Sequence, residues 1–245
     1  EESVVMMPET DGFRYNADDV ISYFCDKDVS NLVIVNPDNP TGNYIPRADV
    51  LRLIDWAAEK GIKLIIDESF VDFSEENSTL IDSNILAKNP HLVVVKSISK
   101  SYGVPGLRLG VLASGDAKLI ADIKRDVAIW NINSFGEFYM QIAEKYKSDY
   151  VLALKKFKEE RRRFVELLSS FKSIRVFPSE ANYLLIELCG ISAEELTKNL
   201  LINDDILVKD LTQKLGGSVK EFMRIAIRNT DDNDKLIEAL RKYLS

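Results

Sequence analysis

The sequence predicts an α/β protein with a three-layer α/β/α large domain, built on a mostly parallel sheet, and a smaller C-terminal α+β domain. Two patterns predict this fold class. Apolar runs rich in valine and isoleucine alternate with helical stretches over the first half of the chain, which is typical of a parallel sheet covered by crossover helices. Beyond residue 148 the strands become shorter and alternate with helices. We therefore divide the chain into domains 1–147 and 148–245.

Four strands are expected to form the sheet of the large domain. Continuous apolar runs predict strands at 31–35, 63–67 and 92–96, each buried on both faces. A fourth strand at 108–113 follows a glycine-bearing loop so closely that we expect it at an edge or in an antiparallel pair. Between the first two strands, Pro46 opens a helix that ends just before Gly61.

The remaining elements are expected mainly after residue 116. A helical pattern begins there, is interrupted at 130–134, and continues over 135–171. Further strands are expected near 3–7 and at 174–177, 182–187, 206–208 and 223–227, and further helices near 193–201 and 231–244. Thr230 is a candidate N-cap for the last of these helices.

Composition excludes several kinds of function. The chain has 32 Lys and Arg against 39 Asp and Glu, a net charge of −7, which argues against an extended nucleic-acid surface. No apolar run approaches the roughly 20 residues that a membrane-spanning helix needs. One histidine and two distant cysteines predict no metal site, and so few cysteines fit a reducing cytoplasm. We assign the single histidine, His91, to a structural position at the start of a buried strand.

The segment 97–110 carries the most chemical information. Lys100 closely follows a strongly apolar strand and so lies at its carboxyl end, where open α/β sheets place their ligands. Ser97 and Ser99 flank it with hydroxyls, and Arg108 follows across a loop that contains two glycines. Two hydroxyls and a guanidinium around one lysine suit a phosphate beside an amine. A lysine that forms a Schiff base next to a phosphate clamp suggests pyridoxal phosphate.

Polar residues also follow two other predicted strands. Asp67 ends the second strand, where its charge needs compensation, and the pyridinium nitrogen of this cofactor would supply it. The alternative is a capping or turn aspartate. Asn39 lies in a loop stiffened by two prolines, from which it can donate to the phenolic oxygen of the cofactor, and the alternative is a plain turn. Because three successive strand ends carry such residues, we interpret them together as one cofactor site.

Segments 36–42, 67–73, 97–110 and 223–228 resemble the fold-type I pyridoxal-phosphate enzymes, specifically the class I/II aminotransferases. Within them the chain resembles the branch that contains histidinol-phosphate aminotransferase and threonine-phosphate decarboxylase. The resemblance implies the large and small domains of that fold, a homodimer and a pyridoxal 5′-phosphate cofactor. The cofactor-binding residues that it implies are Asn39, Asp67, Phe70, Ser97, Ser99, Lys100 and Arg108.

The same resemblance implies two catalytic residues and a substrate contact. Lys100 would carry the Schiff base and then move the proton between the substrate Cα and the cofactor. Asp67 would bind the ring nitrogen and keep it protonated. Arg224 would bind the substrate α-carboxylate, because a planar guanidinium matches a planar carboxylate. The alternative for Arg224 is a surface position on an edge strand.

Two positions depart from the pattern of the family. Phe70 stands where many relatives carry a tyrosine that contacts the phenolic oxygen, and decarboxylase-like members of the branch also use phenylalanine there. Lys209 stands where the branch often has an arginine that contacts the distal phosphate of the substrate. Lysine keeps the charge but loses the two-pronged geometry, which leaves the distal group of the substrate open.

The leading interpretation is an aminotransferase that moves an amino group between a small amino acid, phosphorylated or a phosphonate, and a 2-oxo acid or aldehyde. The alternatives are a decarboxylase of the threonine-phosphate type and a catalytically incomplete module for assembly or dimerisation. In this family an N-terminal segment supplies a phosphate loop and a ring that stacks on the cofactor. The chain begins at Glu1, after the positions that the phosphate loop and the stacking ring would occupy. We therefore expect a longer parent chain, as in relatives fused to a nucleotidyltransferase. In isolation, this chain is expected to bind the cofactor weakly and to show no activity.

Overall fold

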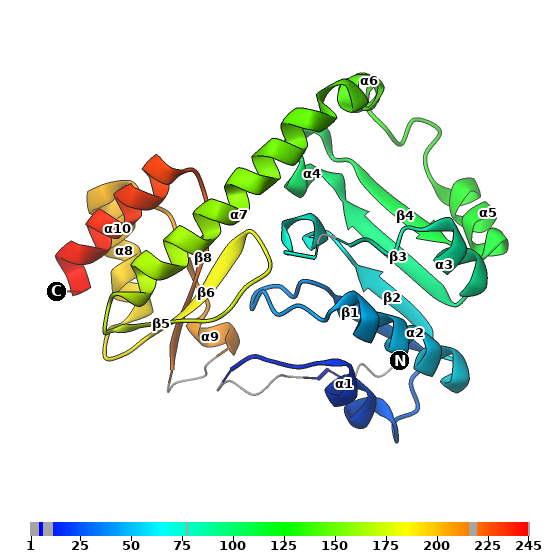
Figure 1. Cartoon of the computed structure of the whole chain (residues 1–245), viewed down its shortest axis with the longest axis horizontal. Helices are drawn as coiled ribbons and strands as arrows, with labels where there is room; N and C mark the ends of the chain where they lie inside the picture. The colour runs from blue at the N-terminus through cyan, green and yellow to red at the C-terminus, as the bar shows by residue number, and fades with distance from the viewer. Residues whose placement is uncertain (1–4, 7–11, 77, 216–219, 245) are drawn as a thin grey trace. The chain divides into compact units, whose positions relative to one another are not determined.

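A computed structural model describes residues 5–6, 12–76, 78–215 and 220–244 (Figure 1). The strand expected near 3–7 lies largely outside these residues. The chain forms two compact units, one comprising mainly Tyr15–Asp38 and Tyr44–Leu152 and the other mainly Asn39–Asn43 and Ala153–Ser245. The loop 39–43 therefore belongs to the second unit, although the sequence places it among the strands of the first. The domain boundary at 147/148 stays a prediction.

The first unit contains a four-stranded sheet in the order β1-β2-β3-β4 (Figure 1). Strands β1 (Asn31–Val35), β2 (Lys63–Asp67) and β3 (Leu92–Ser97) are parallel, and β4 (Gly110–Ser114) pairs antiparallel with β3. The expectation of an antiparallel fourth strand is confirmed. The α/β fold class is also confirmed, with a sheet of mixed direction and helices around it.

Local signals mark the ends of two helices of the first unit, of which only the second was expected from the sequence. Helix α1 (Ala17–Phe24) begins with a capping box between Asn16 and Asp19. Helix α2 (Arg47–Lys60) follows Pro46 and ends at Gly61, whose φ of 68° allows its amide to reach the carbonyls of the last turn. The other helices are α3 (Ser83–Lys88), α4 (Ile98–Ser101), α5 (Ala117–Asp126) and α6 (Ser134–Ala143), with short 3₁₀ turns η1 (Val71–Phe73), η2 (Pro105–Leu107) and η3 (Glu144–Tyr146).

Helix α2 packs against the sheet to form the core of this unit. Leu53 and Ile54 from the helix are almost fully buried with Leu64 and Ile66 from β2. His91 places Nε2 2.9 Å from the carbonyl oxygen of Ile54, which fits the structural role assigned to it.

The expectation that every strand is buried on both faces is wrong for β1. Alternate side chains of β1 are buried, but Val33 between them is 62% exposed. Among the described strands β1 lies at the edge of the sheet, and one of its faces is left uncovered. A continuous apolar run shows that a strand can be buried on two faces, not that the fold covers both.

The second unit contains an antiparallel sheet in the order β5-β6-β8-β7. Its strands are β5 (Ile174–Val176), β6 (Tyr183–Leu188), β7 (Lys209–Asp210) and β8 (Glu221–Ala226), and its helices are α8 (Ala193–Asp204), α9 (Thr212–Leu215) and α10 (Thr230–Leu244). The strand expected at 206–208 is thus displaced to Lys209 and Asp210. The expected helix 135–171 is divided into α6, η3 and α7 (Lys147–Ser169).

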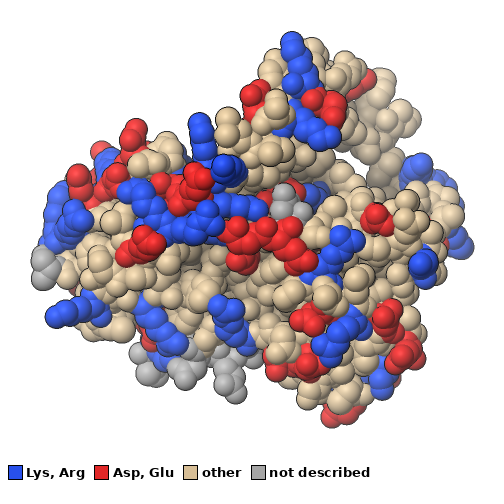
Figure 2. All heavy atoms as spheres, in the orientation of Figure 1, with Lys and Arg blue, Asp and Glu red and all other residues tan. Residues whose placement is uncertain are grey.

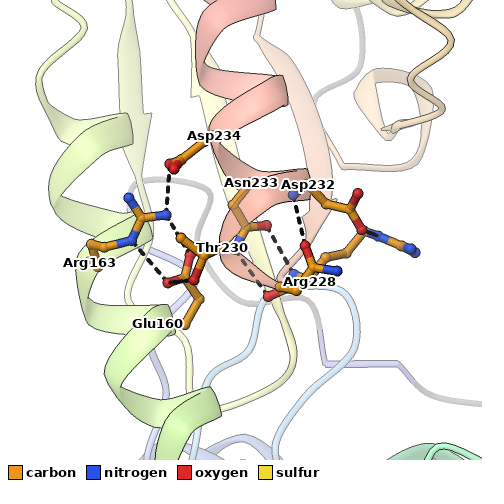
Figure 3. Close-up of polar contacts among 8 residues, drawn as sticks. Glu160, Arg163, Arg228, Thr230, Asp232, Asn233 and Asp234 are labelled. Atoms are coloured by element: carbon orange, nitrogen blue, oxygen red, sulfur yellow. Dashed lines mark hydrogen bonds and ion pairs between the residues drawn. The ribbon is translucent and has the colours of Figure 1, made fainter.

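A polar network joins α7 to the start of α10 in the second unit (Figure 3). Glu160 accepts hydrogen bonds from Arg163, Asn233 and Thr230. The prediction that Thr230 caps α10 is wrong. Asn229 accepts from the amide of Asp232 instead, since the Thr230 hydroxyl donates to Glu160.

Candidate active site

An open depression of about 450 Å³ lies in the first unit at the carboxyl ends of its strands. Asp67 and Ser69 line it from the end of β2, Ser97 from the end of β3, and Arg108 from the loop before β4. Parallel register explains this gathering, because Asp67 is the partner of Val95, two residues before Ser97. The depression therefore holds a carboxylate, hydroxyls and a guanidinium at one edge of the sheet.

Asp67 is held in place by Ser69. Its Oδ1 accepts from the Ser69 amide at 2.8 Å and from the Ser69 hydroxyl at 2.5 Å, and that hydroxyl in turn accepts from the Ser97 amide at 3.0 Å. The turn aspartate considered from sequence is therefore present. It occupies only Oδ1, since no described residue hydrogen-bonds to Oδ2, so one carboxylate oxygen is left to bind a cationic partner. Ser69 is a site residue that sequence reasoning missed, although Asp-x-Ser is a recognisable turn signal.

Lys100 lies in the short helix α4, directly after β3. Its amine makes no hydrogen bond or ion pair with any described residue. Instead Nζ lies 4.4 Å from the centroid of the Phe70 ring, which is itself only 5% exposed. The structure thus brings together two predicted site residues, Lys100 and Phe70, and leaves a primary amine at the end of β3 with its nitrogen available for covalent chemistry.

The two serines beside Lys100 have different surroundings. Ser97 lines the depression, and its hydroxyl has no hydrogen-bond partner among the described residues. Ser99 is 3% exposed, and its hydroxyl donates to the carbonyl and accepts from the amide of Leu109. Ser99 therefore fixes the loop that carries Arg108. Its predicted contact with a phosphate would need the hydroxyl to exchange one of these backbone partners.

Arg108 has an unusual backbone conformation. Its φ is 56° and its ψ 44°, the left-handed region that a residue with a Cβ rarely adopts. The side chain is exposed, and among the described residues it donates to the carbonyl of Pro105 alone, at 3.3 Å. A strained backbone that presents a weakly bound guanidinium at the rim of a depression is typical of a binding residue.

Three predicted site residues lie in the second unit. Asn39 Oδ1 accepts from Arg224 Nη1 at 2.7 Å, and the Arg224 guanidinium also lies 5.2 Å from the Tyr183 ring centroid. Lys209 is the direct partner of Arg224 across the β7–β8 pair, so both cations are side by side on one face of that sheet. This unit therefore offers two neighbouring cations and one amide.

Two titratable residues near the turn that carries Lys100, Asp72 and Tyr150, were also missed in the sequence analysis. Asp72 accepts from Lys96 at 2.7 Å, and both side chains are nearly buried, 12% and 13% exposed. Burial and the nearby carboxylate of Asp72 raise the pKa of Tyr150, from the first turns of α7. Sequence gave no signal for this cluster, because its members are far apart along the chain.

Other kinds of site receive no support. Among the described residues no group of His, Cys, Asp and Glu could hold a metal ion. Lys, Arg, Asp and Glu are intermixed on the face seen in Figure 2, without an extended basic area there. Within the described part of the chain, no helix is both long and apolar enough to cross a membrane.

The family model described as aminotransferase class I and II matches residues 3–240. The chain belongs to this family. The recognition made from motifs is thereby confirmed, and so is the cofactor, since class I/II aminotransferases use pyridoxal phosphate. The residues present fit that group, because an unpaired lysine amine, an available Asp67 oxygen and the Ser97 and Arg108 donors lie in one unit.

Several known proteins are similar to this family member. It is 31% identical over 95% of its length to CMP-5′-(3-aminopropyl)phosphonate synthase of Streptomyces rubellomurinus, and 32% identical over 97% to threonine-phosphate decarboxylase of Salmonella typhimurium. It spans 37% and 63% of those two relatives. The structure of histidinol-phosphate aminotransferase from Clostridium acetobutylicum superposes with a TM-score of 0.86 and 30% identity, covering 98% of this chain and 71% of that one.

Proposed function

We propose that this protein is a pyridoxal-phosphate-dependent aminotransferase that acts on a small amino acid with an anionic distal group and on a 2-oxo acid or aldehyde. One observation carries the proposal. The Lys100 amine has no hydrogen-bonding partner among the described residues and follows the strand end at which Asp67, Ser97 and Arg108 line a depression. The cofactor supplies an electron sink for the bonds of the substrate Cα.

Each residue of the first unit has a separate task in this proposal. Lys100 would be the covalent attachment point of the cofactor and the base that carries a proton to and from the substrate Cα. Asp67, fixed by Ser69, keeps the ring nitrogen protonated through its available oxygen. Ser97 and Arg108 bind the phosphate, and Ser99 holds the Arg108 loop through Leu109. Phe70 packs against the lysine amine and gives no hydrogen bond to the phenolic oxygen.

The second unit would bind the substrate and the phenolic oxygen. Arg224 would take the α-carboxylate and Asn39 would donate its amide to the phenolic oxygen. Lys209, beside Arg224 on the same face, would contact the distal anionic group. The phosphorylated compounds in the names of the relatives support an anionic distal group.

A second candidate is decarboxylation of a phosphorylated amino acid on the same residues. Two observations favour it: Phe70 replaces a hydroxyl-bearing residue beside the lysine, and threonine-phosphate decarboxylase of Salmonella typhimurium is 32% identical. The two reactions differ in which bond of the substrate Cα is broken, the bond to hydrogen or the bond to the carboxylate. Amino transfer to a 2-oxo acid, against release of carbon dioxide from phosphothreonine or phosphoserine, separates them.

The covalent step has a direct test. Borohydride reduction of the cofactor-loaded full-length protein, followed by peptide mapping, is expected to place the adduct on Lys100. The Lys100→Ala variant should lose the adduct and the visible absorbance of the cofactor. An adduct on another lysine of the wild-type protein would contradict the proposal.

We further propose a homodimer in the cytoplasm. Ile129, Trp130 and Phe135 are 95%, 91% and 79% exposed on the segment before and at the start of α6, an apolar area that self-association would cover. Cys25 and Cys189 are free thiols, which fits a reducing compartment. Equilibrium sedimentation of the wild type and of Trp130→Asp tests the dimer, which the charged variant should weaken.

A further inference from the structure

Three buried polar atoms close to Lys100 have no hydrogen-bond partner among the described residues. They are Asp72 Oδ2, Ser101 Oγ and Tyr150 Oη. Buried polar atoms are almost always paired, so an unpaired group of three in one place requires an explanation. The Tyr150 hydroxyl faces both Asp72 and Ser101, and both affect its pKa. The three groups therefore converge on one another and can pair through small side-chain rotations or one shared water.

This cluster surrounds Lys100 along the chain. Lys96, four residues before it, binds Asp72 Oδ1 at 2.7 Å. Ser101, the next residue, turns its hydroxyl toward Tyr150. Tyr102, the one after, stacks on the Tyr150 ring with centroids 4.1 Å apart and planes only 4° from parallel. Asp72 and Tyr150 thus hold the residues on both sides of the lysine.

The lysine turn depends on such external contacts. Helix α4 has four residues, too few to be stable without tertiary support. Among the described residues, the Lys100 side chain makes one cation–π contact, with the Phe70 ring, and its backbone carbonyl accepts from the Gly103 amide at 3.3 Å. Its amine can be directed only through the backbone of the turn, and that backbone is fixed by the neighbours of Lys100.

We propose that Tyr150 is a positioning residue for Lys100, acting with Asp72 as a clamp on both sides of the lysine turn. The tyrosine ring holds Tyr102 by stacking, and its hydroxyl bridges Ser101 and Asp72 once a small side-chain rotation or one shared water pairs them. Tyr150 lies in the first turn of α7, in the same unit as the lysine turn. The proposal rests on the role of Lys100 proposed above.

The test uses substitutions that remove the hydroxyl and the ring separately. Tyr150→Phe keeps the stacked ring and removes the bridge, whereas Tyr150→Leu removes both. Tyr102→Phe keeps the stack, and Tyr146→Phe changes a tyrosine that is 49% exposed, so these two are matched controls. Urea unfolding of each variant shows whether the fold is retained.

The first measurement is amide hydrogen exchange of residues 98–103 in the chain without cofactor. Loss of the bridge in Tyr150→Phe is expected to raise exchange there by roughly three- to tenfold, the equivalent of one hydrogen bond, and Tyr150→Leu should raise it further. Both controls should match the wild type. Unchanged exchange in both Tyr150 variants, or an equal rise in β1 and β2, would overturn the clamp.

The second measurement is site selectivity of cofactor attachment. After brief exposure to pyridoxal phosphate and borohydride, the adduct on Lys100 is compared with that on Lys118, whose side chain is 86% exposed. The ratio should fall several-fold in Tyr150→Leu, less in Tyr150→Phe, and not in the controls. If the wild-type protein carries no adduct on Lys100, the proposed function is rejected but the clamp is not, because hydrogen exchange tests the clamp without the cofactor. An unchanged ratio in both Tyr150 variants would reject the positioning role.

Discussion

Arg224 donates from Nη1 to Oδ1 of Asn39 at 2.7 Å, joining two predicted site residues that lie 185 positions apart. The bond fixes the orientation of the Asn39 amide, because its oxygen points to Arg224 and its NH₂ group must point elsewhere. An amide held in this way presents its two N–H donors to a ligand. The same bond uses one of the five N–H groups of Arg224, and the others remain for a carboxylate. One contact thus assigns a donor role to Asn39 and orients Arg224.

Replacing Arg224 by lysine tests the role of the guanidinium. Arg224→Lys keeps the charge but loses the planar two-pronged geometry that suits a carboxylate, so we expect KM for the amino acid to rise by roughly 10- to 100-fold. Cofactor affinity should change much less. Arg228→Lys is the matched control, because Arg228 lies on the same segment and binds Asp232. An unchanged KM in Arg224→Lys would place the carboxylate elsewhere.

Gly42 is expected to be essential for the position of the Asn39 loop. Its φ is 77°, and a Cβ there would lie 2.1 Å from the Ser179 hydroxyl and 2.9 Å from the Ser179 Cα. The Gly42 carbonyl also accepts from the Glu180 amide at 2.9 Å. Gly42→Ala should therefore displace the loop or destabilise the protein by roughly 2–4 kcal/mol.

Gly61→Ala is the control for that substitution. Gly61 has a φ of 68° but nothing within 4 Å of its Cβ position, so only the backbone penalty of about 1 kcal/mol applies. Urea unfolding compares the two variants. Equal losses would show that contact with Ser179 does not fix the loop.

The positions of Asp67 and Lys100 could be predicted because each follows a strand that its own apolar run specifies. Parallel pairing then brings successive strand ends to one edge without further information. The surroundings of these residues could not be predicted in the same way. Ser99 turns its hydroxyl to Leu109, and Lys96 meets Asp72 from 24 positions away, both through tertiary packing. The uncovered face at Val33 likewise depends on which layers are present.

Asp67→Asn tests the electrostatic role of the carboxylate. A neutral amide cannot keep the ring nitrogen protonated, so we expect turnover to fall by at least ~100-fold with the fold retained. Asp82→Asn is the control, because Asp82 caps α3 through two backbone amides and lines no part of the depression. If the variant turns over nearly as fast as the wild type, Asp67 has only the structural role of a turn aspartate, which its hydrogen bonds to Ser69 also allow.

We expect Arg108 to lower the stability of the fold while it strengthens cofactor binding. Arg108→Gly removes the penalty of a left-handed residue with a Cβ, and the gain should be about 0.5–1 kcal/mol after the larger chain entropy of glycine. The same change should weaken cofactor binding by roughly tenfold or more, since a charge-assisted phosphate contact is lost. Arg108→Lys retains both the strain and a charge. Equal stability of the two variants would show that the backbone at 108 is unstrained.

The network around Glu160 predicts a specific dependence of stability on pH (Figure 3). Hydrogen bonds from Arg163, and then from Asn233 and Thr230, hold the pKa of Glu160 below its usual value against the opposing effect of burial. A carboxylate whose pKa is lower in the folded state stabilises the fold above its unfolded pKa of ~4.3 and loses that contribution as the pH falls through the folded value. Glu160→Gln should therefore cost roughly 1.5–3 kcal/mol near neutral pH, and the difference from wild type should shrink below about pH 4. Glu166 is an exposed residue on the same helix, so Glu166→Gln should leave the free energy of unfolding unchanged at both pH values. If the difference in unfolding free energy between Glu160→Gln and the wild type stays constant down to pH 3, the assignment is contradicted.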